Sequence, residues 1–110
     1  MSALPALSAI ELIAFSEVGS DAPDQAAKFL KSLAHPDRLK VLCVLLDGEL
    51  PVAHIEASVG SSQSAISQHL ARLKEEGIVA ARREGRQILY SISDETVLEV
   101  LAALYKRFCA

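Results

Sequence analysis

Two cysteines and three histidines are the side chains of this 110-residue sequence best suited to hold a metal or to act as nucleophiles. Cys43 and Cys109 lack Cys-x-x-Cys spacing, and His35, His54 and His69 follow no metal-ligand spacing. The sequence therefore predicts no metal site. Two thiols in a cytosolic protein form at most a transient or sensory bridge.

The two thiols have different sequence contexts. Cys43 belongs to an apolar stripe of a helix predicted from Pro36, which by itself favours a buried and inert thiol. Cys109 is the penultimate residue and follows the apolar run of the last predicted helix. The neighbouring Lys106 and Arg107 favour a thiolate at Cys109, whereas the C-terminal end of a helix dipole opposes one. An inert pair and a reactive pair both remain open on these grounds.

Residues 62–77 predict a helix of about four turns with two different faces. Ser62 suits the N-cap because its hydroxyl accepts a hydrogen bond from a free amide, and Gly77 suits the C-terminal end because it tolerates positive φ. One face is an apolar stripe of Ile66, Leu70 and Leu73. The opposite face carries Gln63, Ser64, Ser67, Gln68, Ala71 and Arg72. These short donors and acceptors suit base edges and phosphates.

The preceding segment predicts a partner for this helix. Pro51 stands where a first helical turn begins, an apolar stripe of Val52, Ile55 and Val59 follows, and Gly60 provides the turn. This is the pattern of a helix-turn-helix, whose second helix enters the major groove of DNA. An ordinary surface helix rich in Ser and Gln explains the same pair of helices, so both interpretations stay open here.

A two-stranded wing is predicted after the helix pair. Residues 79–83 and 86–92 flank Glu84-Gly85 and carry alternating apolar and polar side chains. Arg82, Arg83 and Arg86 cluster at the tip, where they would reach phosphates or the minor groove. A solvated hairpin tip is the alternative.

Composition and charge limit the possible functions. At 110 residues with 51% hydrophobic side chains, we expect one domain over residues 1–110. The net charge of −3 argues against strong attraction to nucleic acid, but residues 62–90 hold five Lys/Arg and three Asp/Glu. No long apolar run or signal peptide is present, so we expect a cytoplasmic protein that does not contact membranes. Without a Ser/His/Asp constellation or a glycine-rich loop, we expect neither an enzyme nor a bound cofactor.

Both terminal segments predict helices that are apolar over a wide arc. Residues 4–18 predict the first helix, a second helix runs from Pro23 to Leu33, and Asp94 caps the last helix. A monomer would expose much of this apolar surface, which predicts a homodimer interface containing Leu7, Ile10, Leu101, Leu104 and Phe108. A single small core that absorbs all these residues is the alternative.

Several motifs in residues 30–92 together resemble one family. The motifs are Leu33-Ala34-His35-Pro36-Asp37-Arg38, Gly48-Glu49-Leu50, Ser64-Ala65-Ile66-Ser67-Gln68-His69-Leu70, Glu76-Gly77-Ile78-Val79 and Arg83-Glu84-Gly85-Arg86. They closely resemble the ArsR/SmtB family of winged-helix repressors. The resemblance implies a mainly α fold with a two-stranded β wing, dimerised through its N- and C-terminal helices. It also implies a repressor that leaves an inverted-repeat operator in double-stranded DNA when an inducer binds.

The resemblance assigns roles to individual residues. Arg38 would be a structural residue of its helix, whereas DNA would be contacted by Gln63, Ser64, Ser67, Gln68 and His69. The family's thiolate metal site is missing, because residues 49–53 contain no cysteine. Its zinc site on the last helix is missing too, because residues 94–110 contain no histidine.

The placement of Cys43 and Cys109 resembles the dithiol SqrR/BigR-type branch of the family. Those repressors respond to sulfide-derived persulfides or oxidants by linking two sulfurs, which here would tie the last helix to the third. The inducer would then be a reactive sulfur species or an oxidant. Three alternatives stay open: a metal- or metalloid-responsive repressor that uses the cysteines as ligands, a constitutive DNA-binding repressor, and a protein-interaction module.

Overall fold

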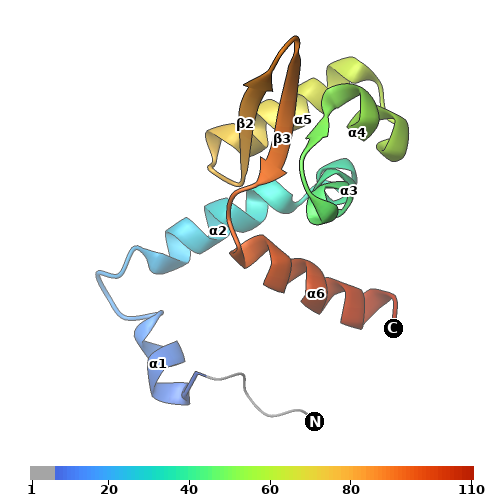
Figure 1. Cartoon of the computed structure of the whole chain (residues 1–110). Coiled ribbons are helices and arrows are strands. Elements are labelled where there is room, and N and C mark those ends of the chain that lie inside the picture. The colour runs from blue at the N-terminus through green and yellow to red at the C-terminus, as the bar shows by residue number, and fades with distance from the viewer. Residues whose placement is uncertain (1–6) are drawn as a thin grey trace. The chain divides into compact units, whose positions relative to one another are not determined.

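The structure is a computed structural model that describes residues 7–110. Internal contacts divide the chain into two compact units, one ending at Lys31 and one beginning at Ser32. The first contains α1 (Ala9–Ala14) and most of α2 (Ala22–Leu33). The second contains α3 (Pro36–Val44), a 3-10 turn (Leu45–Asp47), β1 (Leu50–Pro51), α4 (Val52–Val59), α5 (Gln63–Glu75), β2 (Val79–Glu84), β3 (Gln87–Ile92) and α6 (Thr96–Phe108) (Figure 1). The single domain expected over residues 1–110 stays a prediction.

The first unit holds a shorter first helix than the sequence predicts. Helix α1 starts at a capping box, in which the Ser8 hydroxyl accepts from the Glu11 amide at 3.1 Å and the Glu11 carboxylate accepts from the Ser8 amide at 3.0 Å. The helix ends at Ala14, where the Ser16 hydroxyl donates to the carbonyl of Ile13 at 2.9 Å. The prediction of a helix over residues 4–18 is therefore too long at both ends, since Leu7 and Ser8 precede the helix and residues 15–18 follow it, and Leu4 lies outside the described residues. Helix α2 agrees with its predicted span.

The core of the second unit is formed by apolar side chains of the helices and by the base of the sheet. The stripe predicted for α5 is completely buried, as is Ile55 of α4. The fully buried apolar residues are Val41, Leu42, Ile55, Ile66, Leu70, Leu73, Ile78 and Val97. Burying a side chain of this size contributes about 1.5–3 kcal/mol, so these positions fix how α3, α4 and α5 pack.

Local signals fix the bounds of α5. The Ser62 hydroxyl accepts from the Ala65 amide at 3.1 Å, as predicted for an N-cap. At the other end, the Gly77 amide donates to Lys74 and the Ile78 amide to Leu73, with Gly77 at φ 77°. This pair of bonds is a Schellman motif, which favours glycine at the left-handed position. Helix α5 thus begins and ends at the residues that the sequence indicates.

Strands β2 and β3 form the two-stranded wing that the sequence predicts. The short strand β1, which the sequence did not indicate, adds a third strand to the sheet in the order β1-β3-β2. Leu50 pairs with Tyr90 and Pro51 with Leu89, at the edge where a proline is tolerated. Strands β2 and β3 are antiparallel, and Glu84 pairs with Gln87 across a two-residue turn. Gly85 adopts φ 63° at the first turn position, which shifts the turn one residue beyond the predicted one.

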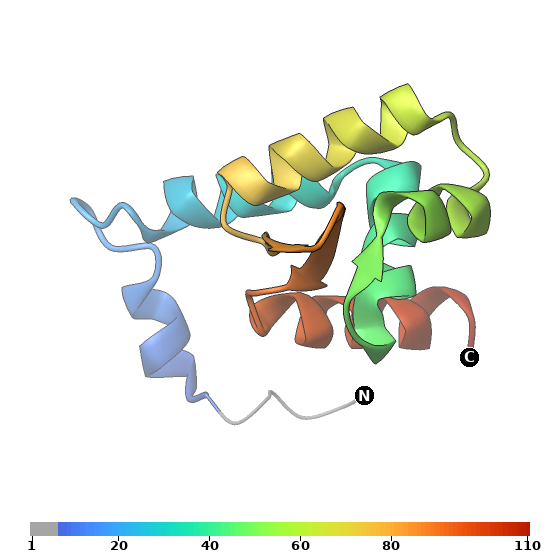
Figure 2. The same ribbon diagram turned by 45° about the horizontal axis from the view of Figure 1, so that its top comes forward.

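Helix α6 follows the wing and crosses α3, with which it lines a pocket (Figures 1 and 2). The N-cap residue is Glu95, one position after the predicted Asp94. The Asp94 carboxylate still accepts from the Thr96 amide at 2.9 Å, just before the first turn. Val97 and Leu101 attach the helix to the core. Among residues 7–110, none of the helices has the length and apolar character needed to cross a membrane.

Candidate nucleic-acid interface and thiol pocket

One side of α5 presents an exposed polar surface. We call it the recognition surface and define it by five exposed residues of α5, namely Gln63, Ser64, Ser67, Gln68 and Arg72. Its position follows from the buried stripe on the other side of the helix, where Ile66 and Leu70 have no solvent exposure. Amide, hydroxyl and guanidinium groups so displayed can hydrogen-bond base edges in a major groove.

The wing supplies positive charge near its turn. Arg83 at the end of β2 and Arg86 in the turn are both exposed. Side chains of this type bind phosphate or reach into a minor groove, so their placement suits the predicted contact with DNA. The predicted DNA contacts of the recognition surface and the wing stay predictions.

Arg82 has protein partners in the structure. Its guanidinium donates to both carboxylate oxygens of Glu49, at 2.6 and 2.8 Å, and lies 2.8 Å from Glu84. These hydrogen bonds raise the pKa of Arg82 and hold the pKa of Glu49 below its usual range. The bidentate pair links β2 to the residue before β1. The sequence predicts that Arg82 contacts phosphate. To do so, Arg82 would have to exchange these carboxylate partners for a phosphate.

His69 lies on a different side of α5 from the recognition surface. Its side chain is only 13% exposed, and its ring centroid is 4.5 Å from that of His35 at the start of α3. The Nε2 atom lies 4.0 Å from an Asp37 oxygen. Burial lowers the pKa of His69, and the neighbouring His35 and Arg38 lower it further. The structure thus directs His69 toward α3, so we leave it out of the recognition surface.

His35 and His69 lie close together, although the three histidines follow no metal-ligand spacing in the sequence. His35 is the N-cap of α3, and its Nδ1 accepts from the Asp37 amide at 3.1 Å. The Ser61 hydroxyl donates to Asp37 at 2.7 Å, and this hydrogen bond lowers the pKa of Asp37 below its usual value although burial opposes the shift. His54 lies exposed on α4. Spacing along the chain gave no signal for the contact between His35 and His69.

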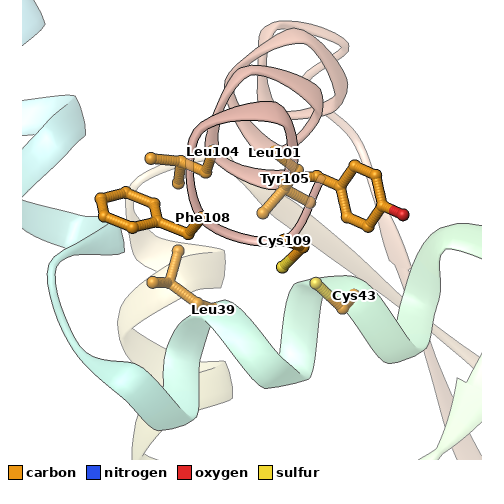
Figure 3. Close-up of a pocket in the computed structure, with 7 residues that line it drawn as sticks. All are labelled: Leu39, Cys43, Leu101, Leu104, Tyr105, Phe108 and Cys109. Atoms are coloured by element: carbon orange, nitrogen blue, oxygen red, sulfur yellow. The ribbon is translucent and has the colours of Figure 1, made fainter.

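The two cysteines line one pocket between α3 and α6. Cys43 belongs to α3 and Cys109 is the residue after α6, and both thiols are free. The pocket has a volume of about 280 Å³, and its other lining residues are Leu39, Leu101, Leu104, Tyr105 and Phe108. Figure 3 shows the two sulfur atoms directed toward one another across the gap between the helices. We call this site the thiol pocket.

Cys43 is exposed, so the expectation of a buried thiol on the apolar stripe of α3 is wrong. Val41 and Leu42 of α3, with Leu45 of the following 3-10 turn, face the core, which leaves Cys43 turned toward α6. Partial desolvation raises the pKa of the Cys43 thiol, and the neighbouring Cys109 raises it further. Cys43 is therefore a weaker nucleophile at neutral pH than an ordinary cysteine.

The residues predicted for the dimer interface differ in exposure. Leu7 is 48% exposed, Ile10 80% and Phe108 70%, while Leu104 is half-buried in the thiol pocket. Leu101 is buried within its own chain, which leaves it little surface for a partner. For all five residues the interface stays a prediction.

Comparisons with known proteins agree on one group of regulators. The family described as bacterial regulatory protein, arsR family, matches residues 35–81. The biofilm growth-associated repressor of Xylella fastidiosa is 40% identical over 87 residues, covering 79% of this chain and 76% of that protein. The crystal structure of the transcriptional repressor BigR from Xylella fastidiosa has a TM-score of 0.80 at 34% identity, covering 94% of this chain and 99% of that one. A homodimeric winged helix-turn-helix DNA-binding domain from Mycobacterium bovis has a TM-score of 0.69 at 31% identity, covering 94% of this chain and 88% of that domain.

Proposed function

The chain belongs to the ArsR family of bacterial regulatory proteins, and we propose that it is a homodimeric repressor released from its operator when a sulfur bridge joins Cys43 and Cys109. Its relatives and its winged helix-turn-helix fold are those of transcriptional regulators, so the chain is a DNA-binding regulator and not an enzyme. The observation that carries the thiol proposal is the pair of free sulfurs that face one another in the thiol pocket.

DNA binding is proposed to use α5 and the wing together. The recognition surface would enter the major groove, with Gln68 and Ser64 at base edges. Arg83 and Arg86 would contact phosphates. The local positive balance of residues 62–90 supports this orientation, although an excess so small implies few phosphate contacts per subunit.

A dimer is supported by apolar side chains that a single chain leaves in contact with solvent. On α6, Leu98 is 45% exposed, Tyr105 61% and Phe108 70%. Large exposed apolar patches mark interaction surfaces, and a twofold interface would cover the same patch on both subunits. The similar domain from Mycobacterium bovis is homodimeric. Two recognition helices about 34–36 Å apart would then read an inverted repeat.

The proposed chemistry starts at Cys109, because the raised pKa of Cys43 disfavours its thiolate. The Cys109 thiolate attacks the sulfane sulfur of a low-molecular-weight persulfide, forms a sulfur–sulfur bond and expels the donor as its thiolate. The Cys43 thiolate then attacks Sγ of Cys109, the inner sulfur of this persulfide, and expels the outer sulfur as hydrosulfide, leaving a disulfide. A second sulfur transfer before closure gives a bridge with one additional sulfur atom.

The same closure follows from a peroxide. Cys109 is oxidised to a sulfenic acid while the peroxide is reduced, and Cys43 displaces water to form the disulfide. Either bridge ties the end of α6 to α3. Because α3 also contacts α5 through Asp37 and His69, a shift of α3 would reach the recognition helix.

The decisive experiment follows DNA binding and intact mass together. Reduced protein is titrated with an inverted-repeat duplex, then treated with a persulfide donor or, separately, with peroxide. We expect weaker DNA binding and a mass consistent with an internal bridge. Cys43→Ser and Cys109→Ser should each keep the reduced affinity and stay bound after treatment, since neither can close the bridge. Folding is checked by circular dichroism.

Two other functions give different outcomes. In a constitutive repressor, both single variants and the wild type would remain bound after treatment. A metal-responsive repressor using the cysteines would release DNA upon metal addition. Among the described residues, the one group of three or more His, Cys, Asp or Glu side chains close enough to hold an ion contains neither cysteine, which disfavours this alternative. If both serine variants still release DNA after treatment, the dithiol proposal is wrong.

A further inference from the structure

We propose that His35, Asp37 and His69 form a binding site for a transition-metal ion of the zinc type, which would join the start of α3 to the recognition helix. One potential ligand atom from each residue lies within 4.8 Å of the other two. Two imidazoles and a carboxylate form one of the common donor sets for Zn²⁺. The site contains no cysteine and is separate from the thiol pocket.

Asp37 is oriented by a neighbouring hydroxyl. The Ser61 hydroxyl donates to Oδ2 at 2.7 Å, and the same oxygen lies 4.0 Å from Nε2 of His69. A carboxylate has about four lone-pair sites on its two oxygens, so this bond leaves acceptor capacity for an ion. A hydrogen bond of this kind to a ligating carboxylate is typical of the groups that orient metal ligands.

His69 presents its ring to the same position. Its side chain is 13% exposed and its Nε2 lies 4.0 Å from the Asp37 carboxylate. An imidazole binds a metal through the lone pair of its unprotonated nitrogen.

His35 must change one hydrogen bond to complete the site. Its Nδ1 lone pair now accepts from the Asp37 amide at 3.1 Å. An ion bound at Nδ1 would replace this amide as the partner of the ring. The amide lies in the first turn of α3 and would then donate to water. The ring already lies beside His69, with centroids 4.5 Å apart and planes inclined at 51°.

The required movement is small. Zinc–nitrogen bonds of about 2.0–2.1 Å in a tetrahedron place ligand atoms about 3.3 Å apart. The three side chains must therefore approach one another from separations of up to 4.8 Å, through rotations about their side-chain bonds. All three are half-buried, which leaves a route for the ion and a fourth position for water. Nitrogen donors favour Zn²⁺, Co²⁺ or Ni²⁺ over Mg²⁺ and Ca²⁺.

The test uses Co²⁺ as a spectroscopic probe and the full chain with both cysteines replaced by serine, which removes competing thiolates. We expect the visible absorption of a tetrahedral cobalt site to saturate at one ion per chain. His35→Asn and His69→Asn should each abolish it. Asn at position 35 retains an oxygen that can cap α3. His54→Asn is the matched control, because His54 lies exposed on α4 and outside the cluster.

Two further measurements separate binding from folding. Circular dichroism without metal should be the same for all variants, and Zn²⁺ should raise the melting temperature only where His35 and His69 are both present. Ser61→Ala should weaken Zn²⁺ binding by about 10–100-fold in competition with a chelator. Cobalt absorption that survives in both histidine variants, or the absence of a tetrahedral spectrum in the well-folded parent, would overturn the site.

Discussion

The recognition surface and the thiol pocket differ in the polarity of their side chains. The recognition surface is polar, exposed and backed by a fully buried stripe of α5. The thiol pocket is lined mainly by apolar side chains, with two free sulfurs at the gap between α3 and α6. The first suits a large polar partner and the second a small reagent. Helix α3 lies near His69 of α5 through Asp37 near its start, and it lines the thiol pocket through Cys43 near its end.

This difference implies a division between the two regions, which should affect different steps of DNA binding. Changes in the recognition surface should alter which DNA is bound, without affecting release. Changes in the thiol pocket should alter assembly and release, without affecting sequence preference. Each prediction below tests one side of that division.

The largest effect is expected from Leu104→Glu in the thiol pocket. Leu104 is half-buried beside Phe108, and a charge without a partner there opposes burial against a second subunit. Sedimentation should show monomers, and binding to an inverted repeat should be lost. Leu104→Met conserves volume and should remain dimeric. A wild type that sediments as a monomer would contradict the dimer itself.

Gln68→Ala should have the next largest effect, and only on the recognition surface. Loss of a base contact should cost about 1–3 kcal/mol on the preferred operator and relax the sequence preference. The measurement is a binding titration against the operator and a shuffled duplex. Release by a persulfide donor should be unchanged, and an altered release would undermine the division between the two regions.

The pH dependence of thiol chemistry sharpens the description of the pocket. Because partial desolvation raises the pKa of Cys43, its thiolate forms at higher pH than that of a fully solvated cysteine. In the Cys109→Ser variant, alkylation of Cys43 should be slow at neutral pH and should keep increasing beyond the ordinary thiol pKa of about 8.5. Mass spectrometry of timed samples provides the rate. A half-maximal rate below that pH would show that the pocket activates Cys43.

The smallest effect is expected from Arg83→Ala on the wing. Loss of one phosphate contact should weaken binding to all sequences alike and reduce the slope of log affinity against log salt by about 1. Arg82→Ala should behave differently, because it removes the ion pairs with Glu49 and Glu84 and so acts on the wing itself. Selective loss of operator preference in Arg83→Ala would place this side chain at a base instead.

The sequence by itself determined the elements whose signals are local. The Ser62 cap, the apolar stripe of α5 and Gly77 act over one to four residues, so the bounds of this helix follow from its own side chains. The wing follows in the same way from alternation around a glycine turn. The family motifs run through these same elements, which is why the fold class could be predicted.

Only the tertiary structure decided which distant residues meet. The packing of α3 against the core, not its apolar pattern, turns Cys43 outward and places it beside Cys109. The contact of His35 with His69, the pairing of Arg82 with Glu49 and the third strand at Leu50 all join segments far apart in the sequence. Such contacts depend on how whole helices pack. Spacing along the chain indicates which residues are neighbours within one helix or hairpin. It gives no signal for a contact between residues that are far apart in the sequence and meet only when whole helices pack.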